Sequence, residues 1–103
     1  MLRRSRFGEL VARQLELFAA DERDLLEEAS QADAAWTNAS RDDSEERYGE
    51  YQLVVDAVGE RLYDVREGYA ASLDQVAAAE YRAAFDRAAR KRLGRLAAFL
   101  DDD

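Results

Sequence analysis

The chain contains no histidine, no cysteine and no proline, and each absence excludes a class of structure or function. Without cysteine it has no disulfide and no thiolate metal ligand. Without histidine it lacks the Glu-x-x-His pairs of di-iron helical bundles and the base that most often activates a serine nucleophile. We therefore expect no enzyme activity, no cofactor and no metal site.

One row of carboxylates could still be considered as a metal site, because Asp56, Glu60 and Asp64 follow one another at intervals of four residues. Successive residues of a helix are turned by about 100°, so the apolar stripe of this segment centres nearly opposite Glu60. The row is therefore expected to face solvent rather than to hold a metal ion.

Long apolar runs are also missing. No segment approaches the ~20 apolar residues that a membrane-spanning helix needs. Residues 1–6 are basic, but Glu9, Arg13, Gln14 and Glu16 interrupt the sequence that follows, so we expect no signal peptide. A cytoplasmic protein that does not contact a membrane is the expectation.

The residues that are present have the composition of an amphipathic helical protein. Of 103 residues, 48% are hydrophobic and 37% are charged, and the formal net charge is −8. A chain of this length fits one domain, so residues 1–103 are predicted to form a single helical unit. The acidic balance argues against nucleic-acid binding, which ordinarily needs a basic surface.

Apolar residues recur every three or four positions in three segments, which predicts helices over residues 5–36, 44–70 and 73–100. The first stripe consists of Phe7, Val11, Leu15, Phe18, Leu25, Ala29, Ala32 and Trp36. The second consists of Tyr48, Tyr51, Val55, Val58, Leu62, Val65 and Tyr69. The third consists of Ala78, Tyr81, Phe85, Ala89, Leu93, Leu96 and Leu100.

The first helix admits two interpretations. Either it continues without a break to Trp36, or Asp21 caps a second helix after a break. The phase of the apolar residues continues through this region, which favours one helix about 45 Å long. Ser5 is a candidate N-cap of this helix, and Ser72 or Asp74 is a candidate cap of the third.

Helices of similar length joined by short links pack as antiparallel neighbours. The predicted fold is therefore all-α, an up-down-up antiparallel three-helix bundle with long helices. The link that follows Tyr69 is only a few residues long, so the second and third helices are expected to form a hairpin.

Tyrosine and tryptophan are numerous for a small bundle, with five Tyr and one Trp. Their apolar bodies and polar tips suit either the edge of a core or an interface. Two leucines, Leu17 and Leu53, also lie off the apolar stripes. The leading hypothesis is a non-enzymatic interaction or structural protein that self-associates as a homo-oligomer or docks a helical partner. Its candidate interaction surface is Trp36, Tyr48, Tyr51, Leu53, Tyr63 and Tyr69.

Basic residues in the third helix support an alternative function. Arg87, Arg90, Lys91 and Arg95 could bind phosphate groups of a nucleic acid or a ribonucleoprotein. In an up-down-up bundle, however, these cations lie near the acidic start of the second helix and the acidic end of the first. Pairing with those carboxylates would argue against nucleic-acid binding.

Three stretches of the chain also carry a resemblance. They are residues 46–56 (ERYGEYQLVVD), 63–67 (YDVRE) and 81–85 (YRAAF). In the types and order of these residues, the chain resembles short helical proteins of unknown function from actinobacteria. The likeness covers most of the chain and includes no defined active motif. It implies a small soluble helical protein and transfers no functional residue.

Overall fold

The computed structural model describes residues 6–102, without the side chains of residues 99, 101 and 102, and its regular elements are all helical. They are α1 (Gly8–Asp21), α2 (Arg23–Thr37), α3 (Ser44–Ala70), α4 (Gln75–Leu93) and the 3-10 helix η1 (Gly94–Asp102). The all-α prediction is confirmed. The prediction of three helices is wrong, because the described residues form four α-helices. Ser5, the candidate cap, lies outside the described residues.

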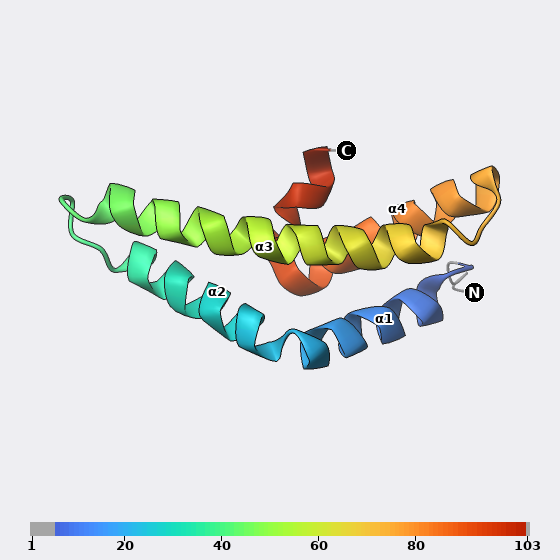
Figure 1. Cartoon of the computed structure of the whole chain (residues 1–103), viewed down its shortest axis with the longest axis horizontal. Helices are drawn as coiled ribbons and strands as arrows, with labels where there is room; N and C mark the ends of the chain where they lie inside the picture. The colour runs from blue at the N-terminus through green and yellow to red at the C-terminus, as the bar shows by residue number, and fades with distance from the viewer. Residues whose placement is uncertain (1–5, 103) are drawn as a thin grey trace, which may run out of the picture.

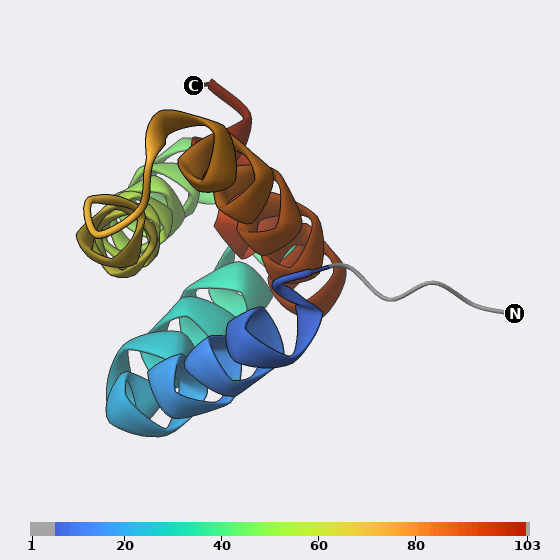
Figure 2. The ribbon, with the colours of Figure 1, turned by 90° about the vertical axis from the view of Figure 1, so that its right-hand side faces the viewer.

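The chain runs along α1 and α2, returns along α3 and turns again into α4 (Figure 1). Seen from one end, the α1–α2 pair, α3 and α4 occupy the three corners of a triangle (Figure 2). α2 packs along α3, α1 packs against α4, and η1 packs on both α3 and α4. The molecule measures 50 × 28 × 23 Å along its principal axes.

The first predicted helix is interrupted at Glu22, so the favoured continuous helix over residues 5–36 does not form. Glu22 has φ −107° and ψ 28°, which are not α-helical values, although its N–H still donates to the Phe18 carbonyl at 2.8 Å. Asp21 is the last residue of α1 and does not cap α2. The bend allows α2 to follow α3 while α1 packs on α4, so both helices bury their apolar faces (Figure 1).

The second predicted helix agrees with the structure, since α3 spans Ser44–Ala70. The start of α4 decides between the two candidate caps. The Oδ1 atom of Asp74 accepts a hydrogen bond from the Ala77 N–H at 2.9 Å, so Asp74 is the cap. The Ser72 hydroxyl instead donates to the Tyr69 carbonyl at 2.7 Å, at the end of the preceding turn.

The third predicted helix is too long, because α4 ends at Leu93 instead of reaching residue 100. Gly94 follows with φ +57° and ψ −126°, a backbone conformation that side chains with a Cβ rarely adopt. The chain therefore leaves the axis of α4 and continues as η1, which packs on α3 and α4 (Figure 1). A glycine that follows a basic last turn is a known signal for the end of a helix, and Gly94 after the basic end of α4 fits this pattern.

The buried core follows the predicted stripes except at the two ends of α3, and Tyr48 at the start of this helix is 44% exposed. The largest side chains without solvent contact are Val11, Val58, Leu62, Tyr81 and Phe85. Late in α3, burial continues from Leu62 in steps of four residues, to Arg66 and Ala70, whereas Val65 and Tyr69 are only partly buried. A charged residue therefore occupies a core position of α3.

Charged residues are spread along all of these helices. Between residues 6 and 102, no helix is both long enough and apolar enough to cross a membrane.

Candidate functional site

Among residues 6–102, no helix packs over one side of the molecule. α4 and η1 lie on one side of the layer that the α1–α2 pair forms with α3 (Figure 2). No described segment covers the opposite side, which faces the reader in Figure 1. We call this side the open face. Two grooves lie on it, both formed between the α1–α2 pair and α3.

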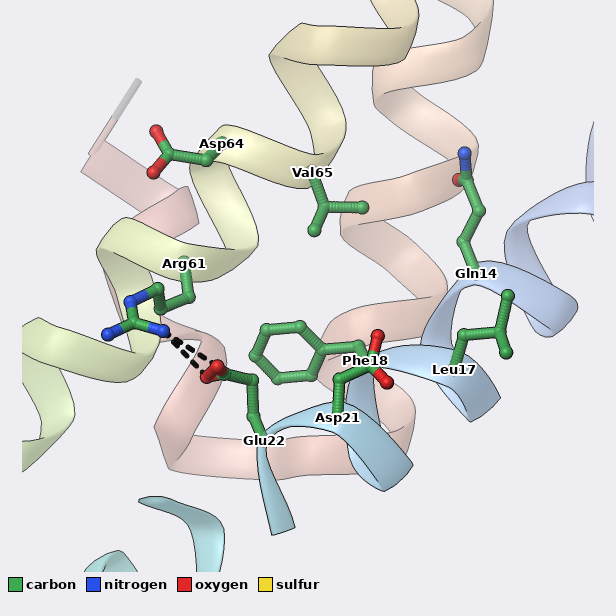
Figure 3. Close-up of a pocket in the computed structure, with 8 residues that line it drawn as sticks. All are labelled: Gln14, Leu17, Phe18, Asp21, Glu22, Arg61, Asp64 and Val65. Carbon is green, nitrogen blue, oxygen red and sulfur yellow. Dashed lines mark hydrogen bonds and ion pairs between the residues drawn. The ribbon is translucent and has the colours of Figure 1, made fainter. Parts of the chain in front are cut away.

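The first groove, which we call the elbow groove, lies where α1 meets α2 and has a volume of about 370 Å³ (Figure 3). Leu17 stands at its edge and is 57% exposed, while Phe18 and Val65 form an apolar floor. The Glu22 carboxylate accepts two hydrogen bonds from Nη1 of Arg61, at 2.6 and 2.8 Å, and this bridge bounds one end of the groove. The remaining lining residues are Gln14, Asp21 and Asp64.

The second groove, which we call the hairpin groove, lies between α2 and α3 and has a volume of about 430 Å³. Leu53 is 72% exposed at its edge, and Val54 is partly buried. The small residues Ala32 and Ala35 on α2 leave room between the two helices. The polar lining residues are Glu28, Gln31 and Glu50.

The two grooves lie on the same face because the residues of α3 that line them point to the same side of that helix. On α3, Leu53, Arg61 and Val65 fall within about 120° of one another when each residue turns the helix by about 100°. Leu17 and Asp21 on α1 are likewise one turn apart, as are Glu28 and Ala32 on α2. The elbow and hairpin grooves are therefore successive parts of one continuous face.

Carboxylates outnumber cations on this face. Its charged lining residues are Asp21, Glu22, Glu28, Glu50, Arg61 and Asp64. Glu22 is bound by Arg61, and Glu50 is bound by Arg47 with a shortest N–O distance of 3.0 Å. Within the described part of the chain, Asp21, Glu28 and Asp64 form no ion pair. The open face therefore combines exposed leucines with uncompensated negative charge.

The predicted interaction residues do not form one surface. Trp36, Tyr48 and Tyr51 pack on one another at the α2–α3 hairpin, with ring centroids 4.7 Å apart for Trp36 and Tyr48 and 5.2 Å for Trp36 and Tyr51. Arg95 of η1 lies over this cluster, 5.9 Å from the Trp36 ring and 5.7 Å from the Tyr51 ring. These aromatic side chains thus contact groups within the chain.

The other three predicted interaction residues lie apart from that cluster. Tyr69 packs on the buried Tyr81, with ring centroids 4.8 Å apart. Tyr63 is 40% exposed and lies beside the Arg66 guanidinium, 5.2 Å from its ring centroid. Leu53 is the member of the predicted set that lines a groove of the open face.

The predicted phosphate-binding cations are also divided. Arg95 is bound to Asp33 near the end of α2, with 2.7 Å between Nη2 and Oδ1, as the charge pattern predicted. Arg87 and Lys91 line a separate groove of about 310 Å³ between α1 and α4. Arg90 is exposed on α4 and is not among the residues that line this groove.

A charge network that sequence reasoning missed joins α3 to α4. The buried Arg66 guanidinium donates to Asp86 at 2.8 and 3.0 Å and to Glu67 at 2.9 Å. Arg82 donates two further hydrogen bonds to Glu67, each at 2.9 Å, and they hold the pKa of Glu67 below its ordinary value. The spacing of four residues from Leu62 to Arg66 was the signal that could have placed this arginine in the core.

The buried polar groups do not suggest a reactive site. Tyr81 has no solvent contact, and its hydroxyl donates to Oε1 of Gln14 at 2.7 Å. Burial raises the pKa of Tyr81 to about 12, so the phenol stays protonated and is not a base near neutral pH. Across residues 6–102 no group of three or more carboxylates is placed to hold a metal ion, and Asp56, Glu60 and Asp64 are exposed.

Compared with protein-family models, curated proteins and solved structures, the chain gives no match.

Proposed function

We propose that this protein is a non-enzymatic docking protein whose open face binds a helix of a protein partner. One observation carries the proposal: the two leucines that lie off the apolar stripes, Leu17 and Leu53, line the two grooves of this one face. Both side chains are more than half exposed in the free chain. A partner that covered them would remove apolar surface from water, which favours binding.

The arrangement of the helices supports a helical partner. In a four-helix bundle, each pair of adjacent helices is covered by helices packed against it. Here α4 and η1 supply such cover on one side only. A partner helix laid between the α1–α2 pair and α3 would cover the floor of both grooves, and each half-exposed leucine would contribute roughly 1–2 kcal/mol.

A second copy of the chain suits this face less well than a different protein does. Two copies that met open face to open face would bring Asp21, Glu28 and Asp64 of one copy against the acidic open face of the other, and like charges repel. If the open face instead bound a different surface of a second copy, the copies would assemble head to tail. The last copy would then keep an uncovered open face unless the assembly closed into a ring. We therefore take a different protein, encountered in the cytoplasm, as the partner.

Nucleic-acid binding, the alternative, has less support. Arg95, one of the four predicted phosphate-binding cations, is bound to Asp33, and the nearby cation Arg82 on α4 is bound to Glu67. The net charge of −8 also repels a polyanion. That function would show itself as oligonucleotide binding that weakens steeply with added salt.

A selection from a displayed library of helical peptides tests the docking proposal. The bait is the full chain, as wild type, Leu17→Glu, Leu53→Glu and Val76→Glu, each checked for helix content by circular dichroism. We expect peptides retained by the wild type to bind the Leu17 and Leu53 variants at least tenfold less tightly, because a carboxylate there would lose hydration on docking.

Val76→Glu is the matched control. Val76 is 80% exposed and lies in the first turn of α4, outside both grooves, where a negative charge suits the helix dipole. It should retain the same peptides as the wild type. Peptides retained equally by all four baits would contradict the proposal. So would sedimentation that showed a wild-type dimer dissociated by Leu17→Glu or Leu53→Glu.

A further inference from the structure

Resting on the proposed docking function, we infer that the partner segment is a basic amphipathic helix with two large apolar side chains about eleven residues apart. The inference follows from the separation of the elbow and hairpin grooves along α3 and from the uncompensated carboxylates around them. It specifies both the charge and the spacing of the segment that the open face recognises.

The charge of the segment follows from the carboxylates of the open face. Asp21 and Asp64 line the elbow groove, and Glu28 lines the hairpin groove. None of the three has an ion-pair partner among residues 6–102. Arginine or lysine residues beside the apolar side chains of a partner would meet these carboxylates, whereas acidic residues would be repelled.

The spacing follows from the positions of Leu53 and Val65, one in each groove, which are twelve residues apart on α3. At 1.5 Å per residue they are separated by about 18 Å along the helix. In a partner helix laid alongside α3, eleven residues span about 16.5 Å and complete three turns, so both apolar side chains point the same way. A spacing of seven residues spans only about 10.5 Å and cannot reach both grooves.

Between the two grooves stands the ion pair of Arg61 and Glu22. Its two charges compensate each other, so this part of the face attracts neither sign of charge strongly. Arg61 is eight residues from Leu53 and four from Val65, so the partner crosses the ion pair about one third of the way from its apolar side chain in the elbow groove to the one in the hairpin groove. A small residue at that point of the partner would let its helix pass close to the bridge.

Other occupants lack this combination of charge and apolar surface. An anionic lipid surface or a nucleic acid would be repelled by the carboxylates. The basic helix α4 of a second copy has cations, but Tyr81, Phe85 and Ala89 are buried within its own chain, and its exposed Val76 lies at the far end from Lys91. A separate basic helix is therefore the occupant that the open face fits.

Fluorescence anisotropy with labelled helical peptides tests the inference on the full chain. The first probe carries two leucines eleven residues apart with lysines on both flanks. The second has glutamates in place of the lysines, and the third has its leucines seven residues apart. We expect the first probe to bind at least tenfold more tightly than either of the others, and to lose this binding in Leu17→Glu and Leu53→Glu.

A charge variant separates the role of the carboxylates from general attraction. Asp21→Asn, Glu28→Gln and Asp64→Asn together should weaken the first probe about tenfold, since each exposed pair contributes modestly. The control variant removes the same amount of charge from three exposed carboxylates that line neither groove. They are neutralised as Glu16→Gln, Asp42→Asn and Glu45→Gln. It should change the affinity of the first probe by less than about twofold, because exposed charges that do not line the grooves are partly screened by salt.

The possible failures are distinguishable. If the acidic probe or the seven-residue probe binds as tightly as the first, or if no probe binds, the inference is overturned. The docking function would still stand if peptides from the library selection depend on Leu17 and Leu53. If no library peptide depends on those leucines, the docking function itself fails.

Discussion

The guanidinium of Arg66 on α3 holds the carboxylate of Asp86 on α4, with Nη1 at 2.8 and 3.0 Å from the two carboxylate oxygens. Arg66 is only 3% exposed, so its charge would be costly without this partner. Glu67 and Arg82 extend the network, and the four charges sum to zero. The network ties α3 to α4 on the side away from the open face.

Asp86→Asn should lower the free energy of unfolding by about 1.5–3 kcal/mol, because it replaces hydrogen bonds between charged groups around a buried guanidinium. The control is Asp56→Asn, on α3 but outside the charge network. Asp56 is exposed and accepts one hydrogen bond from Gln52 at 3.1 Å. That change should stay within about 0.5 kcal/mol. Urea denaturation at pH 7 measures both, and equal effects would refute a structural role for the Arg66–Asp86 pair.

Glu67 should make the folded state sensitive to acid. Hydrogen bonds from Arg82 hold its pKa below the ordinary value of 4.5, so the folded state favours the ionised carboxylate. This stabilisation is present above about pH 4.5 and is lost as the pH falls through the lowered pKa. Urea midpoints between pH 7 and pH 3 should fall less steeply for Glu67→Gln than for the wild type. Glu60→Gln, at an exposed position of α3, should keep the wild-type slope.

Tyr81 should make the folded state sensitive to base. Burial raises its pKa to about 12 from the ordinary value of 10, so folding favours the neutral phenol. The neutral phenol therefore contributes its full stabilisation below pH 10, and the free energy of unfolding falls by about 2–3 kcal/mol as the pH rises to 12. Tyr81→Phe should lose the hydrogen bond to Gln14 yet show a flatter decline between pH 10 and 12. Tyr48→Phe, at a 44% exposed position, should decline as the wild type does.

Two glycines should respond to alanine in opposite directions. Gly94 has φ +57°, so Gly94→Ala strains the backbone and should cost at least about 1 kcal/mol, although open space surrounds the added Cβ. Gly49 lies inside α3, also in open space, and Gly49→Ala should stabilise the fold by up to about 1 kcal/mol. Thermal denaturation of both variants checks the signs, and a stabilising Gly94→Ala would contradict the helix end described above.

The apolar stripes predicted most of the core because local helix periodicity and burial agree along α1, the middle of α3 and α4. They predicted a continuous first helix because the phase is unbroken at Glu22. The bend there comes instead from packing, since α2 follows α3 and α1 follows α4. Neither preference can be read from the stripe of one helix alone.

The candidate site was only partly predictable for the same reason. Leu17 and Leu53 stood out as apolar residues off the stripes, but their relation depends on how two distant helices are laid together. The aromatic residues were the more conspicuous signal, yet Trp36, Tyr48 and Tyr51 stack on one another beneath Arg95. An aromatic excess does not by itself tell an internal cluster from a binding surface.

Methyl NMR of the full chain shows whether a helical peptide binds on the open face. The leucine and valine methyl groups are labelled with ¹³C, and a helical peptide selected on the wild-type chain is added in steps. We expect the methyl signals of Leu17, Leu53 and Val65 to shift together with one dissociation constant, while those of Val76 stay in place. Saturable shifts that are confined to Val76, or that leave Leu17 and Leu53 unchanged, would contradict docking on the open face.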